Sequence, residues 1–555
     1  MTLRPLTVLA LAAGSVLLAF AQGTAQQINP PAPAASPAPS PSATAPAAPV
    51  PGASGTPAAS AAPSPTPTPT PPPIVVNPPA AQVAVGAQTV LRVNSAMGAL
   101  QVSTAPAGIL TAAADPTGQS VTLTGVAPGA ATVTITDQRG ISASVPVRVA
   151  YLAGTVGASA AIRITGDPAS PQFIKEEALR AALTQVQARP GAQVIATLDQ
   201  ISYDKPLGQD HIADVAVPVL LQGENLFSVD TVVHVRVENL AAPKITPDSL
   251  MVSDFPEKLT TNGVLFTSDL KHTQPSRFLY FHYNPPGEPD RRIVLRAQNM
   301  SSEPAIVQYI SGSGGPDPNE MAAGHAATYN FLKHLAQNEG RVIVIPGNGT
   351  IQLAQQALPA KDIACALLQL RVLNGGTVHL TLFAQNASSP PDEQIANEQL
   401  LSGDHPHARG IYRIPEFHDS RLWNTNEDVL ELPIGQIPLP NELQGEALAG
   451  DYGVLQSFVI KVQNPTSAPV PIAIYENPRG GRATGTYLID GVLIQSHQVP
   501  PFSHYKVRQY VVPARGFVRV TIETIPDSGS SYPVRLEFAP DDGSVPPGAP
   551  GSPIF

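Results

Sequence analysis

The sequence predicts a mainly β protein with tandem β-sandwich domains, one small α+β domain and a disordered Pro/Ala-rich linker. Short runs of alternating apolar and polar residues recur along most of the chain, separated by Gly, Pro and Asn, as in half-buried strands joined by turns. A Pro- and Ala-rich segment lies near the N-terminus, and two stretches of the C-terminal half resemble each other. At 555 residues the chain is also too long for one compact domain.

Residues 1–25 are expected to be a secretory signal peptide. Arg4 provides a positive start, residues 6–20 form an apolar run, and Ala19-Phe20-Ala21 matches a cleavage signal. An uncleaved N-terminal anchor is the alternative, since the apolar run is only slightly short for a membrane span. No later stretch is apolar enough to cross a membrane. We therefore expect an exported protein that is periplasmic, cell-surface or extracellular in a bacterium, with no membrane span after signal removal.

Residues 26–73 are expected to be a disordered linker, because they consist almost wholly of Pro, Ala, Ser and Thr. Such a composition has almost no side chains that could form a core. Repeated Pro favours an extended polyproline II chain. The segment is either a stalk that holds later domains off a surface or a passive tether.

Residues 74–150 alternate with period two and predict a small β-sandwich. In ATVTITD, for example, Val133 and Ile135 alternate with threonines. The stretch LTGVAPGAATVTITDQRGISASVPVRV, residues 123–149, resembles the closing strands of bacterial Ig-like domains. It is also similar to the N-terminal domain of pilus-assembly secretin proteins. The resemblance implies an Ig-like spacer, adhesive or envelope-assembly module.

Residues 151–240 are expected to form a small α+β domain, with one helix on a sheet. Ser170-Pro171 supplies an N-cap and a favoured first helical residue, and Pro190-Gly191 is expected to end the helix. Strands are expected before and after it.

Two β-sandwich units, repeat A (residues 245–390) and repeat B (residues 403–541), are predicted from an internal duplication. Residues 293–310 align without a gap with residues 458–475, and residues 345–370 align with residues 499–524. Both blocks share apolar alternation and turn residues in the same order. Residues 542–555 are expected to be a flexible tail.

Repeat A carries extra chain between its two aligned blocks, where a helix is expected at about 317–337. Asp317 is the expected N-cap, with Pro318 at the first helical position. One face of this helix carries Met321, His325, Tyr329 and Leu332. Repeat B reads as β at the equivalent place, so copy-specific function is expected at this insertion.

The candidate binding residues are Gly314, Gly315, Asp317 and His325. Glycines before a helix can form an anion-binding nest, but a flexible connector is the favoured interpretation, because the Gly-Lys-Ser/Thr ending of a phosphate loop is missing. His325 could be a ligand or a base, or a packed and hydrogen-bonded core histidine. Trp423 is expected to anchor a core.

No catalytic residue, metal site or cofactor is expected. His405, His407 and His418 form the only local histidine group, but they fall in a loop without the fixed convergence that a metal needs. Cys365 aligns with Arg519 of repeat B, which favours an outward-facing, inert thiol. A lone cysteine also excludes an internal disulfide.

The net charge of -10, with no dense Lys/Arg block, argues against nucleic acid and anionic membrane surfaces as partners. The leading functional hypothesis is a non-enzymatic envelope or cell-surface protein, with a structural, adhesive or assembly role. Its partners would be other envelope or surface proteins or glycans. The alternatives are a secreted enzyme or metal-dependent protein that uses the insertion or the His-Pro-His loop, and a carbohydrate-binding protein.

Overall fold

A computed structural model describes residues 72–390, 399–403, 407–440, 447–543 and 546–548 of the protein. The expected signal peptide, nearly all of the expected linker and most of the expected tail lie outside the described residues. The chain divides into two compact units. Of the described residues, the first unit contains 72–154 and the segments 188–193 and 222–229, and the second contains the others.

The first unit contains the expected β-sandwich, in which two four-stranded sheets have the orders β1-β3-β6-β5 and β2-β8-β7-β4. Val133 and Ile135 of β7 are fully buried, as their alternation with threonines predicted. The strands are β1 (Val75–Asn77), β2 (Ala81–Ala84), β3 (Gln88–Asn94), β4 (Gln101–Ala105), β5 (Leu110–Ala114), β6 (Ser120–Gly125), β7 (Gly129–Thr136) and β8 (Ser142–Ala150).

Helix α1 (Pro171–Leu183) starts where the sequence predicts. The hydroxyl of Ser170 accepts a hydrogen bond from the Phe173 amide at 3.3 Å, and Pro171 occupies the first turn. The helix ends before the expected Pro190-Gly191, because strand β11 (Val186–Ala188) follows it. No helix among the described residues is long and apolar enough to cross a membrane.

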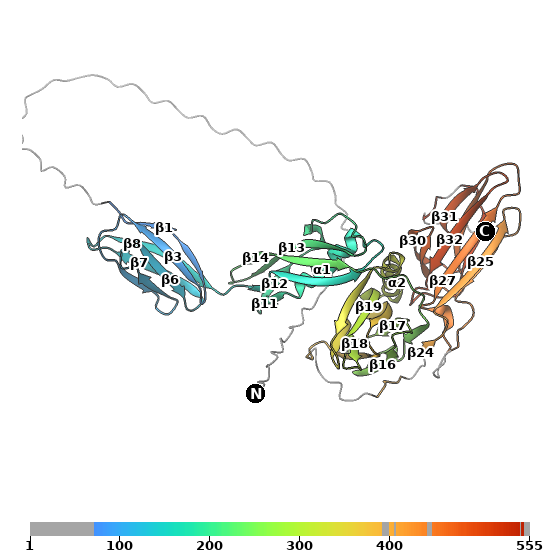
Figure 1. Cartoon of the computed structure of the whole chain (residues 1–555), viewed down its shortest axis with the longest axis horizontal. Helices are drawn as coiled ribbons and strands as arrows, with labels where there is room; N and C mark the ends of the chain where they lie inside the picture. The colour runs from blue at the N-terminus through green and yellow to red at the C-terminus, as the bar shows by residue number, and fades with distance from the viewer. Residues whose placement is uncertain (1–71, 391–398, 404–406, 441–446, 544–545, 549–555) are drawn as a thin grey trace, which may run out of the picture. The chain divides into compact units, whose positions relative to one another are not determined.

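A ten-stranded sheet continues from the expected α+β segment into repeat A (Figure 1). Its order is β12-β13-β14-β10-β20-β19-β22-β17-β15-β24. Strand β10 makes the link, since it lies parallel to β14 and antiparallel to β20. The strands of this sheet outside repeat A are β10 (Ser159–Thr165), β12 (Ala192–Ile195), β13 (His211–Gly223), β14 (Val229–Asn239) and β24 (Arg409–Tyr412). Strand β9 (Gly154–Val156) pairs with β11 in a separate two-stranded sheet, and the 3-10 helices are η1 (Leu198–Gln200) and η2 (Ala449–Asp451).

Repeats A and B are two β-sandwiches, which confirms the predicted tandem fold. Repeat A contains β15 (Ser249–Ser253), β16 (Gly263–Leu270), β17 (Ser276–Tyr283), β18 (Arg291–Asn299), β19 (Ala305–Asp317), α2 (Glu320–Ala336), β20 (Gly340–Ile345), β21 (Thr350–Leu358), β22 (Ile363–Asn374) and β23 (Val378–Asn386). Repeat B contains β25 (Glu416–Asn424), β26 (Leu430–Ile434), β27 (Leu455–Gln463), β28 (Val470–Pro478), β29 (Ala483–Ile489), β30 (Val492–Val499), β31 (Tyr505–Val512), β32 (Phe517–Thr524) and β33 (Val534–Pro540).

The two repeats share one strand layout. In repeat A the sheets run β15-β17-β22-β19-β20 and β16-β23-β18-β21, and in repeat B they run β25-β27-β32-β29-β30 and β26-β33-β28-β31. Each strand thus corresponds to the strand numbered ten higher. The directions agree as well, since β15 and β25 are the strands that lie parallel to β17 and β27. Repeat A has helix α2 between β19 and β20, whereas no helix lies between the corresponding strands β29 and β30 of repeat B.

The alignment of residues 345–370 with residues 499–524 pairs strands that correspond in the two repeats. The alignment of residues 293–310 with residues 458–475 is shifted by one strand. Residues 293–310 cover β18 and β19, and residues 458–475 cover β27 and β28, although β18 corresponds to β28. These residues align because each stretch contains the same asparagine turn. Asn299 donates to the carbonyls of Glu303, Ile345 and Pro346, and Asn464 donates to those of Ala468, Val512 and Pro513. This turn recurs at two different places in the same layout.

Helix α2 covers the outer face of the main sheet of repeat A (Figure 1). Ala323, Ala327 and Phe331 pack with Cys365 in a buried cluster, which also includes Val454, Leu455 and Ile525 of repeat B. Cys365 is therefore fully buried, and the expectation that it faces outward is wrong. The side chain of Cys365 does point away from the interior of the sandwich, as its position in the strand predicts. The inserted helix covers this face of the sheet and forms a second apolar core with it.

Candidate functional site

Gly314 and Gly315, two of the expected binding residues, lie in β19 beneath α2. A Cβ atom on Gly314 would stand 1.9 Å from the carbonyl oxygen of Ala323 in the helix. Gly315 has a φ of +85°, and its Cβ would stand 2.1 Å from the carbonyl oxygen of Ile363. Gly314 lets the helix backbone approach the strand closely, and Gly315 lets β22 do so. Both glycines belong to a strand covered by a helix, and not to the flexible connector that was the favoured interpretation.

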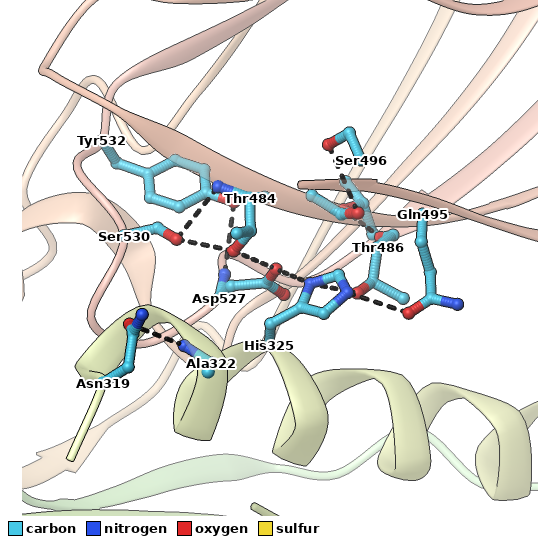
Figure 2. A network of polar contacts seen from close by, with 12 residues as sticks. Asn319, Ala322, His325, Thr484, Thr486, Gln495, Ser496, Asp527, Ser530 and Tyr532 are labelled. Atoms are coloured by element: carbon cyan, nitrogen blue, oxygen red, sulfur yellow. Dashed lines mark hydrogen bonds and ion pairs between the residues drawn. The ribbon is translucent and has the colours of Figure 1, made fainter. Parts of the chain in front are cut away.

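Helix α2 begins at Glu320, and its N-cap is Asn319. The side chain of Asn319 accepts a hydrogen bond from the Ala322 amide at 3.2 Å (Figure 2). The expected cap, Asp317, is the last residue of β19, and its carboxylate accepts a hydrogen bond from the Asn319 amide at 2.7 Å. Asp317 therefore orients the capping residue, and the helix starts later than expected because the strand continues to residue 317.

His325 lies on the buried face of α2 and contacts repeat B through both ring nitrogens (Figure 2). Nδ1 is 2.6 Å from Oδ2 of Asp527, and Nε2 is 2.9 Å from Oε1 of Gln495. Since both partners are acceptors, the ring satisfies both only as an imidazolium. Burial lowers the pKa of His325, but Asp527 and Gln495 outweigh it and raise the pKa above its ordinary value.

Asp527 follows β32 and is held by hydroxyl groups from two segments of repeat B (Figure 2). Its Oδ2 accepts a hydrogen bond from the Thr484 hydroxyl at 2.8 Å, and this hydroxyl lies 2.7 Å from that of Ser530. The Thr484 amide donates to Ser530 Oγ at 3.1 Å. These bonds orient the Asp527 carboxylate toward α2, although its Oδ1 has no hydrogen-bond partner among the described residues.

Glu476 of β28 lies in the interior of repeat B beside this network, where it is fully buried. Neither of its oxygens forms a well-directed hydrogen bond among the described residues, but the hydroxyls of Ser496 and Tyr487 lie near enough to stabilise its charge. Burial raises the pKa of Glu476 to about 7, although these hydroxyls and the charge of His325 act in the opposite direction. The pattern Ile472, Ile474, Glu476 places this carboxylate at an inward position, which is the signal that sequence reasoning missed.

This geometry supports a structural contact between repeats A and B better than it supports catalysis by His325. Both nitrogens of His325 are engaged, and the nearby Thr486 hydroxyl lies 3.4 Å from the nitrogen that already contacts Asp527. A general base needs a nitrogen within reach of a substrate proton. The imidazole instead joins a helix of repeat A to three segments of repeat B, as the packed-histidine interpretation describes.

A cavity of about 490 Å³ adjoins this network, and Ser530 contributes to its wall. His407 stands there between two carboxylates, with Nδ1 3.3 Å from Asp254 and Nε2 3.0 Å from Glu257. Its hydrogen bond with Asp254 raises the pKa of His407. Burial raises the pKa of Asp254 to about 6. The cavity combines these polar groups with apolar side chains such as Phe281.

The histidine group of the expected loop does not converge in the described part of the chain. His405 lies outside it, His407 contacts the cavity carboxylates, and His418 lies 3.3 Å from Glu416. Among the described residues, no group of three or more His, Cys, Asp or Glu is arranged to hold a metal ion. Trp423 is buried in the core of repeat B, as predicted, and its indole donates to the Asp428 carbonyl at 2.8 Å.

No known family model and no curated protein sequence matches the chain. Solved structures that resemble parts of it include the tandem Ig repeats of Dlar, at 8% identity and a TM-score of 0.13, over 30% of this chain and 98% of that one. An endo-beta-1,4-glucanase from Bacillus licheniformis has 11% identity and a TM-score of 0.12, over 30% of this chain and 38% of its own length. The M60 catalytic domain with two CBM51 domains from Clostridium perfringens ZmpB has 9% identity and a TM-score of 0.14, over 84% of this chain and 55% of that one. At such TM-scores these likenesses carry no functional conclusion.

Proposed function

We propose that the protein is an exported, non-enzymatic component of the bacterial envelope or cell surface that spaces, binds or assembles other surface components. The observation that carries this proposal is the engagement of both nitrogens of His325, a repeat A residue, by Asp527 and Gln495 of repeat B. The insertion expected to hold a copy-specific function thus joins two sandwiches into one unit. A stiff pair of sandwiches suits a spacer or an adhesive module, because it presents loops at fixed positions.

The N-terminal sequence supports the same proposal. A signal peptide at residues 1–25 would export the chain, and the Pro/Ala-rich residues 26–73 would hold the sandwiches away from their attachment point. The sandwich at residues 74–150 would add an Ig-like spacer or envelope-assembly module. Its partners would be envelope or surface proteins or glycans.

Co-sedimentation with isolated bacterial envelopes tests this proposal. We expect the secreted chain to be retained saturably, and protease treatment or glycan removal of the envelopes would distinguish protein from glycan partners. Glu431→Gln, which changes an exposed carboxylate of β26, is the control for nonspecific charge effects. Absence of saturable retention on any envelope fraction would contradict the proposal.

The cavity beside His407 supports a second candidate, a secreted enzyme or metal-dependent protein. Asp254, Glu257 and His407 place polar groups on its wall, although the described residues hold no group of three or more His, Cys, Asp or Glu arranged for a metal ion. Metal analysis of the purified chain separates the candidates. Stoichiometric metal that is lost in the double variant His405→Ala and His407→Ala, but kept in His418→Ala, would favour this second function.

A further inference from the structure

Helix α2 and repeat B are in such close contact at Gly324 that no larger side chain fits there. A Cβ atom on Gly324 would stand 1.7 Å from the carbonyl oxygen of Ser528. His325, the next residue, reaches Asp527 at 2.6 Å. The helix backbone and the loop after β32 are therefore in direct contact, and the hydrogen bonds of one imidazole hold this contact together.

Several buried polar groups near this contact lack a well-directed hydrogen bond within the described part of the chain. They are both carboxyl oxygens of Glu476, the hydroxyl of Tyr487 and Oδ1 of Asp527. A neutral carboxyl group in such a place costs a few kcal/mol, whereas an ionised one costs far more unless it is paired. Asp527 already has a charged partner in His325, whereas Glu476 has only the neutral hydroxyls of Ser496 and Tyr487 beside it. The docked arrangement therefore favours the uncharged form of Glu476.

We propose that the contact between α2 and repeat B is a proton-dependent latch, which holds while Glu476 is uncharged and loosens when Glu476 ionises. An additional negative charge in this interior is relieved most readily if the helix separates from the loop and water enters. The titratable groups that face Glu476 come from every element around it: His325 of α2, Tyr487 of β29, Asp527 and Tyr532 of the loop after β32, and Tyr505 of β31.

Two of these groups act in the same direction with pH. The pKa of Glu476 is raised to about 7, chiefly by burial, so its stabilising contribution is complete below its ordinary pKa and is lost as the pH rises through about 7. The pKa of His325 is also raised, so the positive charge that pairs with Asp527 is lost as the pH rises. Burial keeps Tyr487 and Tyr532 neutral throughout, because it raises the pKa of each hydroxyl.

Hydrogen–deuterium exchange of the full chain between pH 6 and 8 tests the latch, with rates corrected for the intrinsic pH dependence of amide exchange. We expect the protection of α2 amides to fall about tenfold over this range, because the open population rises with pH until the pH passes the pKa of the buried Glu476 and then levels off. In Glu476→Gln, which cannot ionise, we expect constant protection. Glu431→Gln changes an exposed carboxylate of the same repeat and should behave as the wild type.

Fluorescence of Trp423, buried in the core of repeat B, reports whether each variant is folded. If Glu476→Gln does not fold, Glu476→Met provides an uncharged side chain of similar volume. Constant protection of α2 in the wild-type chain would overturn the proposal whatever the variants do. An equal loss of protection in the wild type and in a folded Glu476 variant would overturn it as well.

Discussion

Arg277 of repeat A and Glu416 of repeat B form a buried ion pair across the junction of the two sandwiches, with Nη2 2.9 Å from Oε1. Arg277 is fully buried, and its guanidinium also donates to the carbonyls of Pro415 and Gly453 at 2.6 and 3.2 Å. A guanidinium suits this place because its planar fork reaches several acceptors at once. The two repeats are therefore joined by polar contacts as well as by a shared apolar cluster.

Replacing Arg277 with Ala should lower the free energy of unfolding by about 3–5 kcal/mol, because two carbonyls would lose this donor and Glu416 would keep only the exposed His418 as a partner among the described residues. Urea unfolding followed by Trp423 fluorescence measures this loss. Arg535→Ala is the matched control, since its ion pair with Glu431 is exposed and should contribute at most about 1 kcal/mol. Equal losses in both variants would contradict this account of the junction.

Gly324→Ala should destabilise the chain even though Ala favours a helix. At an exposed helical position this change would stabilise by about 1 kcal/mol. Here the added Cβ would meet Ser528, so we expect a loss of about 1–3 kcal/mol and weaker protection of α2. Ala322→Gly, at an exposed position of the same helix, should cost only its helix propensity and leave the docking intact. A stabilised Gly324→Ala variant would show that α2 does not pack as described.

Asn299→Ala and Asn464→Ala should destabilise their repeats by similar amounts, about 1–3 kcal/mol each, because each asparagine satisfies buried carbonyls in the same turn. Thermal unfolding of the two single variants measures this. A large effect at one site and none at the other would show that the shared hydrogen bonds are not equivalent in energy.

His282 should make repeat A sensitive to acid. It is fully buried and neutral, since Nδ1 donates to the Pro256 carbonyl at 2.9 Å and Nε2 lies 3.1 Å from Ser253 Oγ. Burial lowers its pKa to about 4, so its contribution is complete above about pH 6.5 and is lost as the pH falls through 4, by about 3 kcal/mol. His282→Gln should flatten this acid limb of the stability profile, while His379→Gln, at an exposed pair, should not.

Cys365 should resist thiol reagents in the folded chain, because it is fully buried beneath α2 and burial raises the pKa of its thiol. Labelling with a colorimetric disulfide reagent at pH 7 should be stoichiometric only after unfolding in urea. Rapid labelling of the native chain would show that α2 leaves this face of the sheet accessible.

Much of the local structure follows from the sequence alone. Alternation at Val133 and Ile135 predicts which face of β7 is buried, and Ser170-Pro171 predicts where α1 starts. The same periodicity predicts the tandem sandwiches, since a strand with one apolar face must pack against another layer. The shared asparagine turn shows the limit of this reasoning, because a local motif of a few residues can occur at two different strands of one layout.

Tertiary structure decided what lies against each face. Register places Cys365 away from the sandwich interior, yet only the folded chain reveals that α2 covers it. His325 could be assigned to a helix face from its spacing, but Asp527 is 202 residues away along the chain. The periodicity of apolar residues predicts that a side chain is buried. It does not predict which distant segment of the chain covers that side chain. The partners of His325 and Glu476 depend on how two whole sandwiches pack, which no local pattern encodes.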